Sequence, residues 1–408
     1  MPLSSPADPA PPQPHGSSPS RRGARLLLLA AAMLGLVQLL ALAPWMGEDE
    51  PWHVEYASHV AAGYRPWGGQ PMRGPPLSAV DDRVHMPLAQ LQVRRRFADI
   101  PAERIAETQE EILRSMTARH YYQRVDWVGV EPQRSNFDQV ATDFSAKTQP
   151  PVYYQLGGGL LALLSIEHVE DQMWALRGLS WLLYLAGVAA ALGFARCLFE
   201  DESLALSAAA LFAFLPMSAR QAAVVNNDVL AKFLVAVVLL VAARWLTGKA
   251  RRWEPALALV LCLLGLMSKP TAASAAIALL AVPFLRSRRL ADRGRRLVFV
   301  IGLLLVAAVA GYFWLNQHNA ALPRSLVGLR TRLQVGFSAE TYVTIGRTLV
   351  GSFGWESRFL PDGFVLGVLA VGALGLVLAV RALLSRSTPA SRPLLLLCLL
   401  VVGVQIAM

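Results

Sequence analysis

The sequence predicts an all-α, polytopic membrane protein with about nine transmembrane helices and a long first extracytoplasmic loop. Three observations predict this fold class. Hydrophobic residues make up 54% of the 408 residues, which is too apolar for an ordinary soluble protein. Apolar stretches of roughly 15–25 residues recur, close to the length that crosses a hydrocarbon core of about 30 Å. Basic residues gather in short links between these stretches, as they do on the cytoplasmic side of membrane proteins.

The order of these stretches predicts the organisation of the chain. Residues 1–25 begin with a Pro- and Ser-rich segment and are expected to form a disordered cytoplasmic tail. Residues 26–408 are expected to form one transmembrane domain. The first stretch is long for a signal peptide, so we expect it to remain as an uncleaved span. The predicted spans are 26–45, 173–195, 204–219, 228–246, 255–267, 271–285, 297–316, 363–383 and 393–408.

The positive charge follows the same topology. When the spans alternate from a cytoplasmic N-terminus, the basic links fall inside, and two loops near 47–171 and 317–362 fall outside. The net charge of +10 is therefore explained by membrane orientation, and we expect no nucleic-acid partner. The prediction is a multi-pass protein of the inner (plasma) membrane, surrounded by membrane lipids, with its N-terminus in the cytoplasm.

An acidic cluster follows the first span directly, at the predicted outer boundary of the membrane. It contains Asp49 and Glu50, followed by Pro51 and His53. Ionised carboxylates are costly to desolvate, so at this depth they either stay in water or serve a function. A carboxylate pair and a histidine here could take a proton from a substrate at the membrane surface. The alternatives are a solvated turn before Pro51 and a structural hydrogen bond for His53.

The rest of the first loop contains two further segments. Residues 101–124 have apolar side chains at roughly helical spacing, which predicts an amphipathic helix either on the membrane surface or packed on a neighbouring loop. Residues 156–166 are apolar but too short to span comfortably, so a re-entrant or interfacial segment is expected. Tyr153 and Tyr154 would then lie at headgroup depth, where aromatic rings with a polar end are favoured.

Two more polar groups stand on the predicted outer side. Asn227 and Asp228 begin a span, and Lys269 with Pro270 interrupts an apolar stretch. An ionisable residue at the membrane boundary is a functional candidate, and an anionic phosphate is a natural partner for a lysine. Asn and Asp also favour helix N-caps, and a lysine at a helix end can extend its amine into water. These structural alternatives remain open.

The second outer loop contains arginines against the positive-inside trend, including Arg324, Arg330 and Arg358. Guanidinium matches phosphate geometry, so these residues could bind an anionic headgroup or phosphate; the alternative is a solvated amphipathic helix. With the acidic cluster they suggest a reaction in which a base deprotonates an acceptor hydroxyl while cations hold the phosphate of a leaving group. A membrane-embedded donor of this kind would be a polyprenyl phosphate carrying a sugar.

These motifs resemble those of a bacterial membrane protein family with an Asp-Glu-Pro-x-His motif. That family is related to the protein O-mannosyltransferases and lipid A aminoarabinose transferases of the GT-C glycosyltransferase superfamily. Two departures occur, because Glu48 stands where proline is usual and Gln149 stands where histidine is frequent. The second departure removes a metal ligand or hydrogen-bond partner. The motifs that carry the resemblance are Asp49-Glu50-Pro51-x-His53, Pro150-Pro151-Val152-Tyr153-Tyr154, Asn227-Asp228, Lys269-Pro270-Thr271 and Phe353-Gly354-Trp355.

The resemblance implies a GT-C-like domain that transfers a sugar from polyprenyl phosphate to an extracytoplasmic glycan, lipid or protein, with inversion at the sugar carbon. It implies that Asp49 is the catalytic base or positions the acceptor. A divalent metal near the acidic motifs is left open, since some relatives use one and others do not. Further roles are expected as follows: Glu50 and Asp228 tune or orient Asp49, Lys269 binds the donor phosphate with Arg324, Arg330 or Arg358, and His53, Asn227, Tyr153 and Tyr154 contact the substrates.

Two other functions use some of the same residues. A transporter or flippase of lipid-linked glycans would use the arginines and tyrosines without a base, and inverted repeats with paired broken helices would favour it. A polysaccharide polymerase or ligase would use the outer arginines but has no evident need for Asp49 and Glu50. An enzyme of glycan biosynthesis in the cell envelope is therefore the main prediction.

Overall fold

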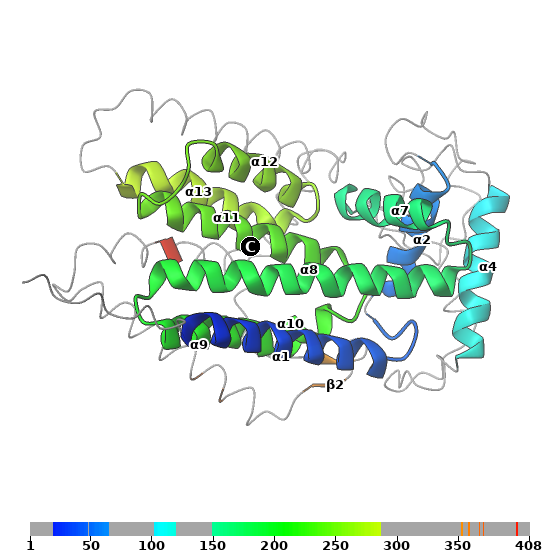
Figure 1. Cartoon of the computed structure of the whole chain (residues 1–408). Helices are drawn as coiled ribbons and strands as arrows, with labels where there is room; N and C mark the ends of the chain where they lie inside the picture. The colour runs from blue at the N-terminus through cyan, green and yellow to red at the C-terminus, as the bar shows by residue number, and fades with distance from the viewer. Residues whose placement is uncertain are drawn as a thin grey trace, which may run out of the picture.

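A computed structural model describes residues 19–47, 49–64, 102–119 and 149–286, with short pieces at 352–353, 358–359, 367, 370 and 397–398. The described residues form a bundle of α-helices (Figure 1). Their β-structure is a two-residue antiparallel pair, β1 (Ser352–Phe353) with β2 (Arg358–Phe359). Most of the tail at 1–25 and of the spans expected at 297–316, 363–383 and 393–408 lies outside the described residues, so the expected number of spans stays a prediction.

Three described helices are long and apolar enough to cross a membrane: α1 (Pro19–Ala41), α8 (Val169–Leu198) and α11 (Asn227–Leu246). They correspond to the spans predicted at 26–45, 173–195 and 228–246. Acidic residues occupy the first turn of α8 and α11, and Arg196 and Arg244 occupy their last turns, which complements the helix dipoles. The length and apolar composition of the three helices, together with the exposed apolar side chains of α1, indicate a membrane protein.

Four other apolar helices are shorter: α7 (Val152–Leu164), α9 (Glu202–Phe214), α12 (Glu254–Leu266) and α13 (Ala273–Arg286). The span predicted at 204–219 differs in the structure, where α9 is followed by the separate α10 (Pro216–Gln221). Pro216 disfavours a helical conformation for the residue before it and provides a favourable first position for the next helix. The turn η3 (Pro270–Ala272) precedes α13.

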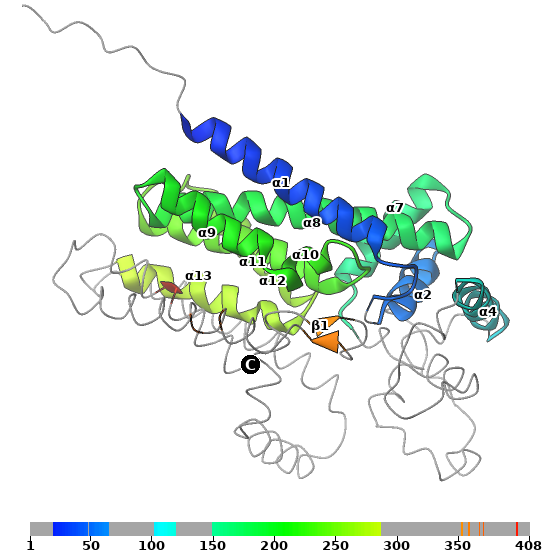
Figure 2. The ribbon, with the colours of Figure 1, turned by 90° about the horizontal axis from the view of Figure 1, so that it is seen from below.

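The long helix α8 lies in the middle of the bundle. It packs along α11 and also contacts α1 and α9, while α12 and α13 pack on α11 (Figures 1 and 2). Tyr184 links α8 to α9, because its hydroxyl donates a hydrogen bond of 2.7 Å to the carbonyl of Ala213 in α9. The framework is thus built by the long helices, which bring the ends of several segments together.

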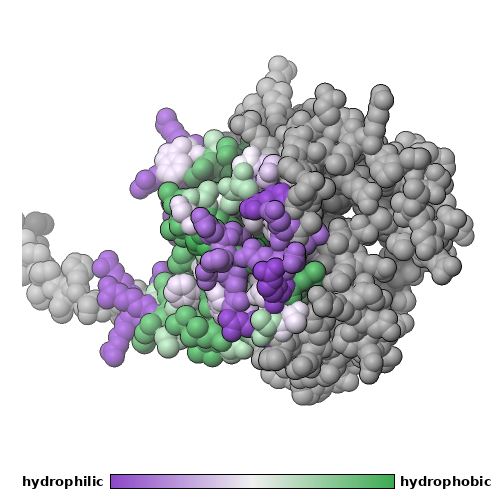
Figure 3. All heavy atoms as spheres, turned by 90° about the vertical axis from the view of Figure 1, so that its right-hand side faces the viewer, coloured by the Kyte–Doolittle hydropathy of each residue, from purple (hydrophilic) through white to green (hydrophobic). Residues whose placement is uncertain are grey.

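One end of the bundle carries α2 (Glu50–Ala61), α4 (Ala102–Ala118) and α7; we call it the α2 end (Figure 1). Glycines of α7 allow α2 to approach closely. A Cβ atom on Gly158 would lie 2.7 Å from the Cβ of Val60 and 2.9 Å from the carbonyl oxygen of Ala57. Seen from this end, hydrophilic side chains gather around the middle of the described surface, with hydrophobic ones around them (Figure 3).

The structure also decides between the two environments expected for the amphipathic helix in the first loop. Ile112 and Met116 of α4 are buried, and the helix contacts α2 and α8. Its polar groups bind the same neighbours: Gln109 donates to Glu55, Glu111 accepts from the backbone of Val169, and Ser115 donates to Glu170. The apolar face of α4 is therefore packed on protein rather than laid on the membrane surface.

Candidate active site

Five predicted site residues from four segments lie close together at the α2 end. The Nδ1 atom of His53 lies 2.6 Å from the hydroxyl oxygen of Tyr154. Lys269 forms an ion pair with Asp228, and the charges of both act on the pKa of His53. The charges of Asp49 and Asp228 act in turn on Tyr154. The long helices thus bring together the groups that the predicted topology placed on one side.

Asp49 occupies the N-cap position of α2 and its carboxylate is exposed. Its backbone is left-handed, with φ of 55°, a conformation that Asp adopts more readily than most residues. Its carbonyl accepts hydrogen bonds of 3.1 Å from the backbone of both Trp52 and His53, while its side chain does not cap the helix. The turn therefore presents the carboxylate to the surface of the α2 end.

Glu50 has the opposite environment, because its side chain is completely buried beside Arg177 of α8. Arg177 binds it in a bidentate manner, with Nε 2.8 Å from Oε1 and Nη2 2.6 Å from Oε2. The backbone amides of Gly47 and Val225 donate to the same carboxylate, at 3.2 and 3.1 Å. Such charge-assisted bonds are strong and directional. This arrangement supports the orienting role among those expected for Glu50.

Arg177 is a buried residue of the candidate site that the sequence pattern did not single out. It also donates to the carbonyl oxygens of Leu42 and Ala43, at 2.7 and 3.0 Å, so it fixes both sides of the turn that carries Asp49. A signal was present, because an arginine inside a predicted span is unusual and calls for a buried partner. The partner itself is 127 positions away in the sequence, and periodicity does not reveal it.

His53 and Tyr154 form a buried pair at the base of the site. The rings are nearly parallel, and Tyr154 also stacks on Tyr56 with centroids 3.8 Å apart. Burial, helped by the positive charge of Lys269 and opposed by Asp228, lowers the pKa of His53 from 6.5 to about 3. His53 is therefore neutral near pH 7, where it orients the tyrosine rather than carrying a charge.

This pKa predicts that replacing His53 with Asn flattens the acid dependence of stability. The folded protein leaves His53 neutral while the unfolded chain protonates it below pH 6.5, so its contribution is present above pH 6.5 and falls toward pH 3. Between pH 7 and pH 5 the wild type should lose about 2 kcal/mol more than the variant. Thermal unfolding of the detergent-solubilised proteins measures this difference. Identical slopes for both proteins would rule out a buried neutral histidine.

Asn227 holds the turn that carries Lys269. Its side-chain amide donates to the carbonyl of Ser268 at 2.9 Å and to Gln149 at 3.3 Å, and the hydroxyl of Ser268 donates back to the carbonyl of Asn227. The N-cap of α11 is Asn226, whose side chain accepts from the amide of Asp228 at 2.7 Å. The carboxylate of Asp228 does not cap the helix and instead meets Lys269.

The hydroxyl of Tyr153 is directed at α8. It lies 3.3 Å from the hydroxyl of Ser180, and both Tyr153 and Tyr154 are fully buried among protein groups. Both rings are therefore packed inside the protein, and their depth relative to the lipid headgroups stays a prediction. Tyr153 joins α7 to α8, which keeps its neighbour Tyr154 directed at His53.

Of the three predicted phosphate-binding arginines, the structure describes one. Arg324 and Arg330 lie outside the described residues, and Arg358 lies on β2 opposite Phe353. Among the described residues, no group of three or more His, Cys, Asp and Glu side chains could hold a metal ion. The nearest donors are already engaged, since Asp228 binds Lys269 and His53 binds Tyr154.

Comparison with known proteins adds one finding. Residues 149–312 match the family model described as dolichyl-phosphate-mannose-protein mannosyltransferase. The match points to a membrane glycosyltransferase of the GT-C type. It covers less than half of the chain, includes Tyr154, Asp228 and Lys269, and begins after Asp49. No curated protein and no solved structure gives a significant match.

This match agrees with the wider relationship that the motifs predicted. The bacterial Asp-Glu-Pro-x-His family that the motifs resemble is related to the protein O-mannosyltransferases, and the matched family model describes enzymes of that kind. Membership in the bacterial family itself stays a prediction, as do the sugar and the acceptor.

Proposed function

We propose that this protein transfers a sugar from a polyprenyl-phosphate donor to an acceptor hydroxyl on the extracytoplasmic side of the inner membrane. The observation that carries the proposal is the grouping of an exposed carboxylate, Asp49, with the Asp228–Lys269 ion pair at one polar end of an apolar bundle. A base and a phosphate-binding cation are the two groups that such a transfer needs. The family match supports the reaction class.

The proposed reaction is a single displacement with inversion. Asp49 takes the proton of the acceptor hydroxyl as that oxygen bonds to the anomeric carbon of the sugar. The bond from this carbon to the phosphate oxygen breaks, and its electron pair stays on the phosphate. Lys269 stabilises the negative charge that develops there. The donor phosphate belongs at headgroup depth, where the α2 end meets the membrane boundary in the predicted topology.

The direct test is transfer by the full chain in detergent or lipid nanodiscs. We expect radiolabelled sugar to move from polyprenyl-phosphate mannose, or from another polyprenyl-phosphate sugar, to an acceptor fraction from membranes. Nucleotide sugars should not serve as donors. Transfer from a nucleotide sugar alone, or movement of the lipid-linked donor across a vesicle without transfer, would overturn the proposal.

Replacing Lys269 with Met should lower kcat/KM for this transfer by about 10²-fold, because one stabilising group at the leaving phosphate is lost. The matched control is Lys249→Met, which removes an exposed lysine after α11 and should leave transfer unchanged. Initial rates over a range of donor concentrations measure both variants. Equal rates for Lys269→Met and the wild type would remove Lys269 from the phosphate site.

A further inference from the structure

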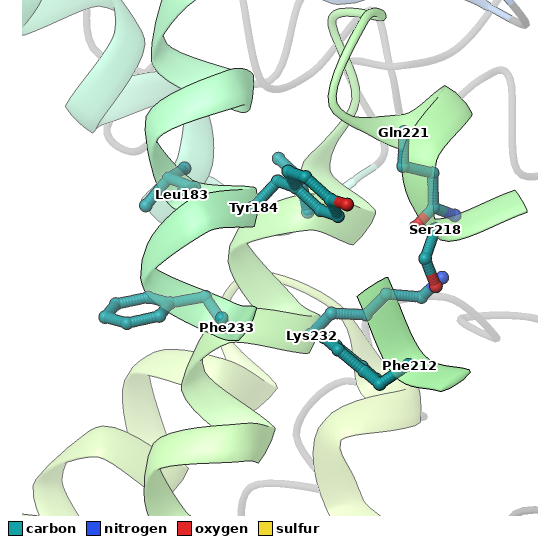
Figure 4. A pocket seen from close by; sticks show the side chains of 9 residues that line it. Leu183, Tyr184, Phe212, Ser218, Gln221, Lys232 and Phe233 are labelled. Atoms are coloured by element: carbon teal, nitrogen blue, oxygen red, sulfur yellow. The ribbon is translucent and has the colours of Figure 1, made fainter. Parts of the chain in front are cut away.

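Lys232 is a charged residue that the proposed reaction does not yet use. It lies on α11 four residues after Asp228, one helical turn farther into the predicted span. Its partly buried side chain extends toward α10 and ends near Ser218 and Gln221, beside a small cavity (Figure 4). Much of the lining is apolar, including Leu183, Phe212 and Phe233.

An ammonium group at this place is costly to keep charged without a counter-ion. Within the described part of the chain, the charged groups that act on Lys232 are Asp228 and Lys269. Asp228 is already paired with Lys269. These three residues therefore contain two cations and one anion, and Lys232 is the one without a carboxylate partner among the described residues.

Asp228 could pair with either lysine. A carboxylate four residues before a lysine on a helix lies on the same face, at the spacing and in the order that favour an ion pair. The amine of Lys232 now extends toward α10 (Figure 4), and rotation of its flexible stem would direct it to Asp228. If Lys269 moved away from Asp228, Lys232 would then pair with the carboxylate in its place.

The proposed reaction gives a reason for such an exchange. A sugar phosphodiester carries one negative charge, whereas the phosphate monoester that leaves carries up to two. The acceptor proton goes to Asp49, so the phosphate gains charge as the bond to the sugar breaks. A lysine engaged by Asp228 neutralises this charge less well than a lysine that is released.

We propose that Lys232 is a positioning residue that replaces Lys269 as the counter-ion of Asp228 when Lys269 binds the phosphate of the donor. This inference rests on the proposed function. In this scheme Lys269 binds the donor phosphate. Lys232 does not contact the phosphate and acts on it only through Asp228. After the exchange Asp228 is paired with Lys232, and the ammonium group of Lys269 is available to the phosphate.

The test is binding of farnesyl phosphate, a short prenyl phosphate, to the full chain in detergent, measured by isothermal titration calorimetry. Lys232→Met should weaken binding about tenfold in the wild-type background and less than about twofold in Asp228→Asn, where Lys269 is already released. Inorganic phosphate and farnesol, measured in the same way, separate recognition of the anion from recognition of the prenyl chain.

Each outcome decides between roles. An equal loss in both backgrounds would mean that Lys232 acts on the ligand directly or only on the fold, and either result would overturn the exchange. Lys249→Met should bind as the wild type does, and Lys232→Arg should restore most of the affinity because it keeps the charge. Absence of farnesyl phosphate binding in the wild type would overturn the proposed donor class, and the exchange with it. Normal wild-type binding that Lys232→Met leaves unchanged would overturn the exchange alone.

Discussion

Replacing Asp49 with Asn should abolish glycosyl transfer while the protein still folds and inserts. The carboxylate is exposed and does not cap α2, and asparagine tolerates the left-handed backbone of this position as aspartate does, so the variant should fold. An amide of the same shape cannot take the proton of an acceptor hydroxyl, and loss of a general base costs about 10²–10⁴-fold in rate. Initial rates of transfer from a polyprenyl-phosphate sugar measure the effect, and thermal unfolding checks the fold.

The control for this prediction is another exposed aspartate. Asp171 lies in the first turn of α8 and is exposed, so Asp171→Asn removes the same chemical group away from the proposed base. It should retain nearly full activity. Retained full activity in Asp49→Asn would exclude Asp49 as the base, and equal losses in both variants would indicate a general effect of negative charge at this end.

Replacing Arg177 with Met should have the largest effect on stability. It leaves the Glu50 carboxylate buried without its cation and the carbonyl oxygens of Leu42 and Ala43 without their donor. Breaking a buried ion pair by removing one partner typically costs about 3–5 kcal/mol. The turn that carries Asp49 would lose its attachment to α8, so transfer should fall together with the unfolding temperature.

An exposed pair provides the comparison. Arg196 and Glu202 form an ion pair near the surface, and Arg196→Gln should cost less than about 1 kcal/mol. The double variant Glu50→Gln with Arg177→Met should recover part of the loss, because no charge remains buried unpaired. Unfolding in detergent measures all variants. A loss for Arg177→Met no larger than that for Arg196→Gln would contradict the anchoring role.

Much of the helical framework could be predicted because its signal is local. Long apolar stretches with basic ends predicted α1, α8 and α11, and the structure places helices there. The predicted alternation also placed Asp49, Asp228 and Lys269 on one side of the membrane, and the packing of the helices brings them close together. The exception was 204–219, where the chain forms two helices because Pro216 favours a new helix start.

The contacts that shape the candidate site could not be predicted in this way. Glu50 and Arg177, His53 and Tyr154, and Asn227 and Ser268 are each far apart in sequence. Side-chain pairing depends on how helices rotate and pack against one another, and hydropathy carries no information on that rotation. The same holds for α4, whose amphipathic pattern fits a membrane surface and a protein surface equally well.

The sequence by itself thus determined that this is a helical membrane protein with polar groups at the ends of its spans, because burial of apolar length in lipid is an additive, local property. The tertiary structure alone decided which of the two neighbouring carboxylates is exposed at the α2 end and which is buried. Packing of α8 against α2 buries Glu50 on Arg177 and leaves Asp49 exposed, although the two residues are neighbours of nearly the same chemistry. A buried carboxylate needs a cation or hydrogen-bond donors beside it, whereas an exposed one is solvated by water, and only the fold assigns each environment.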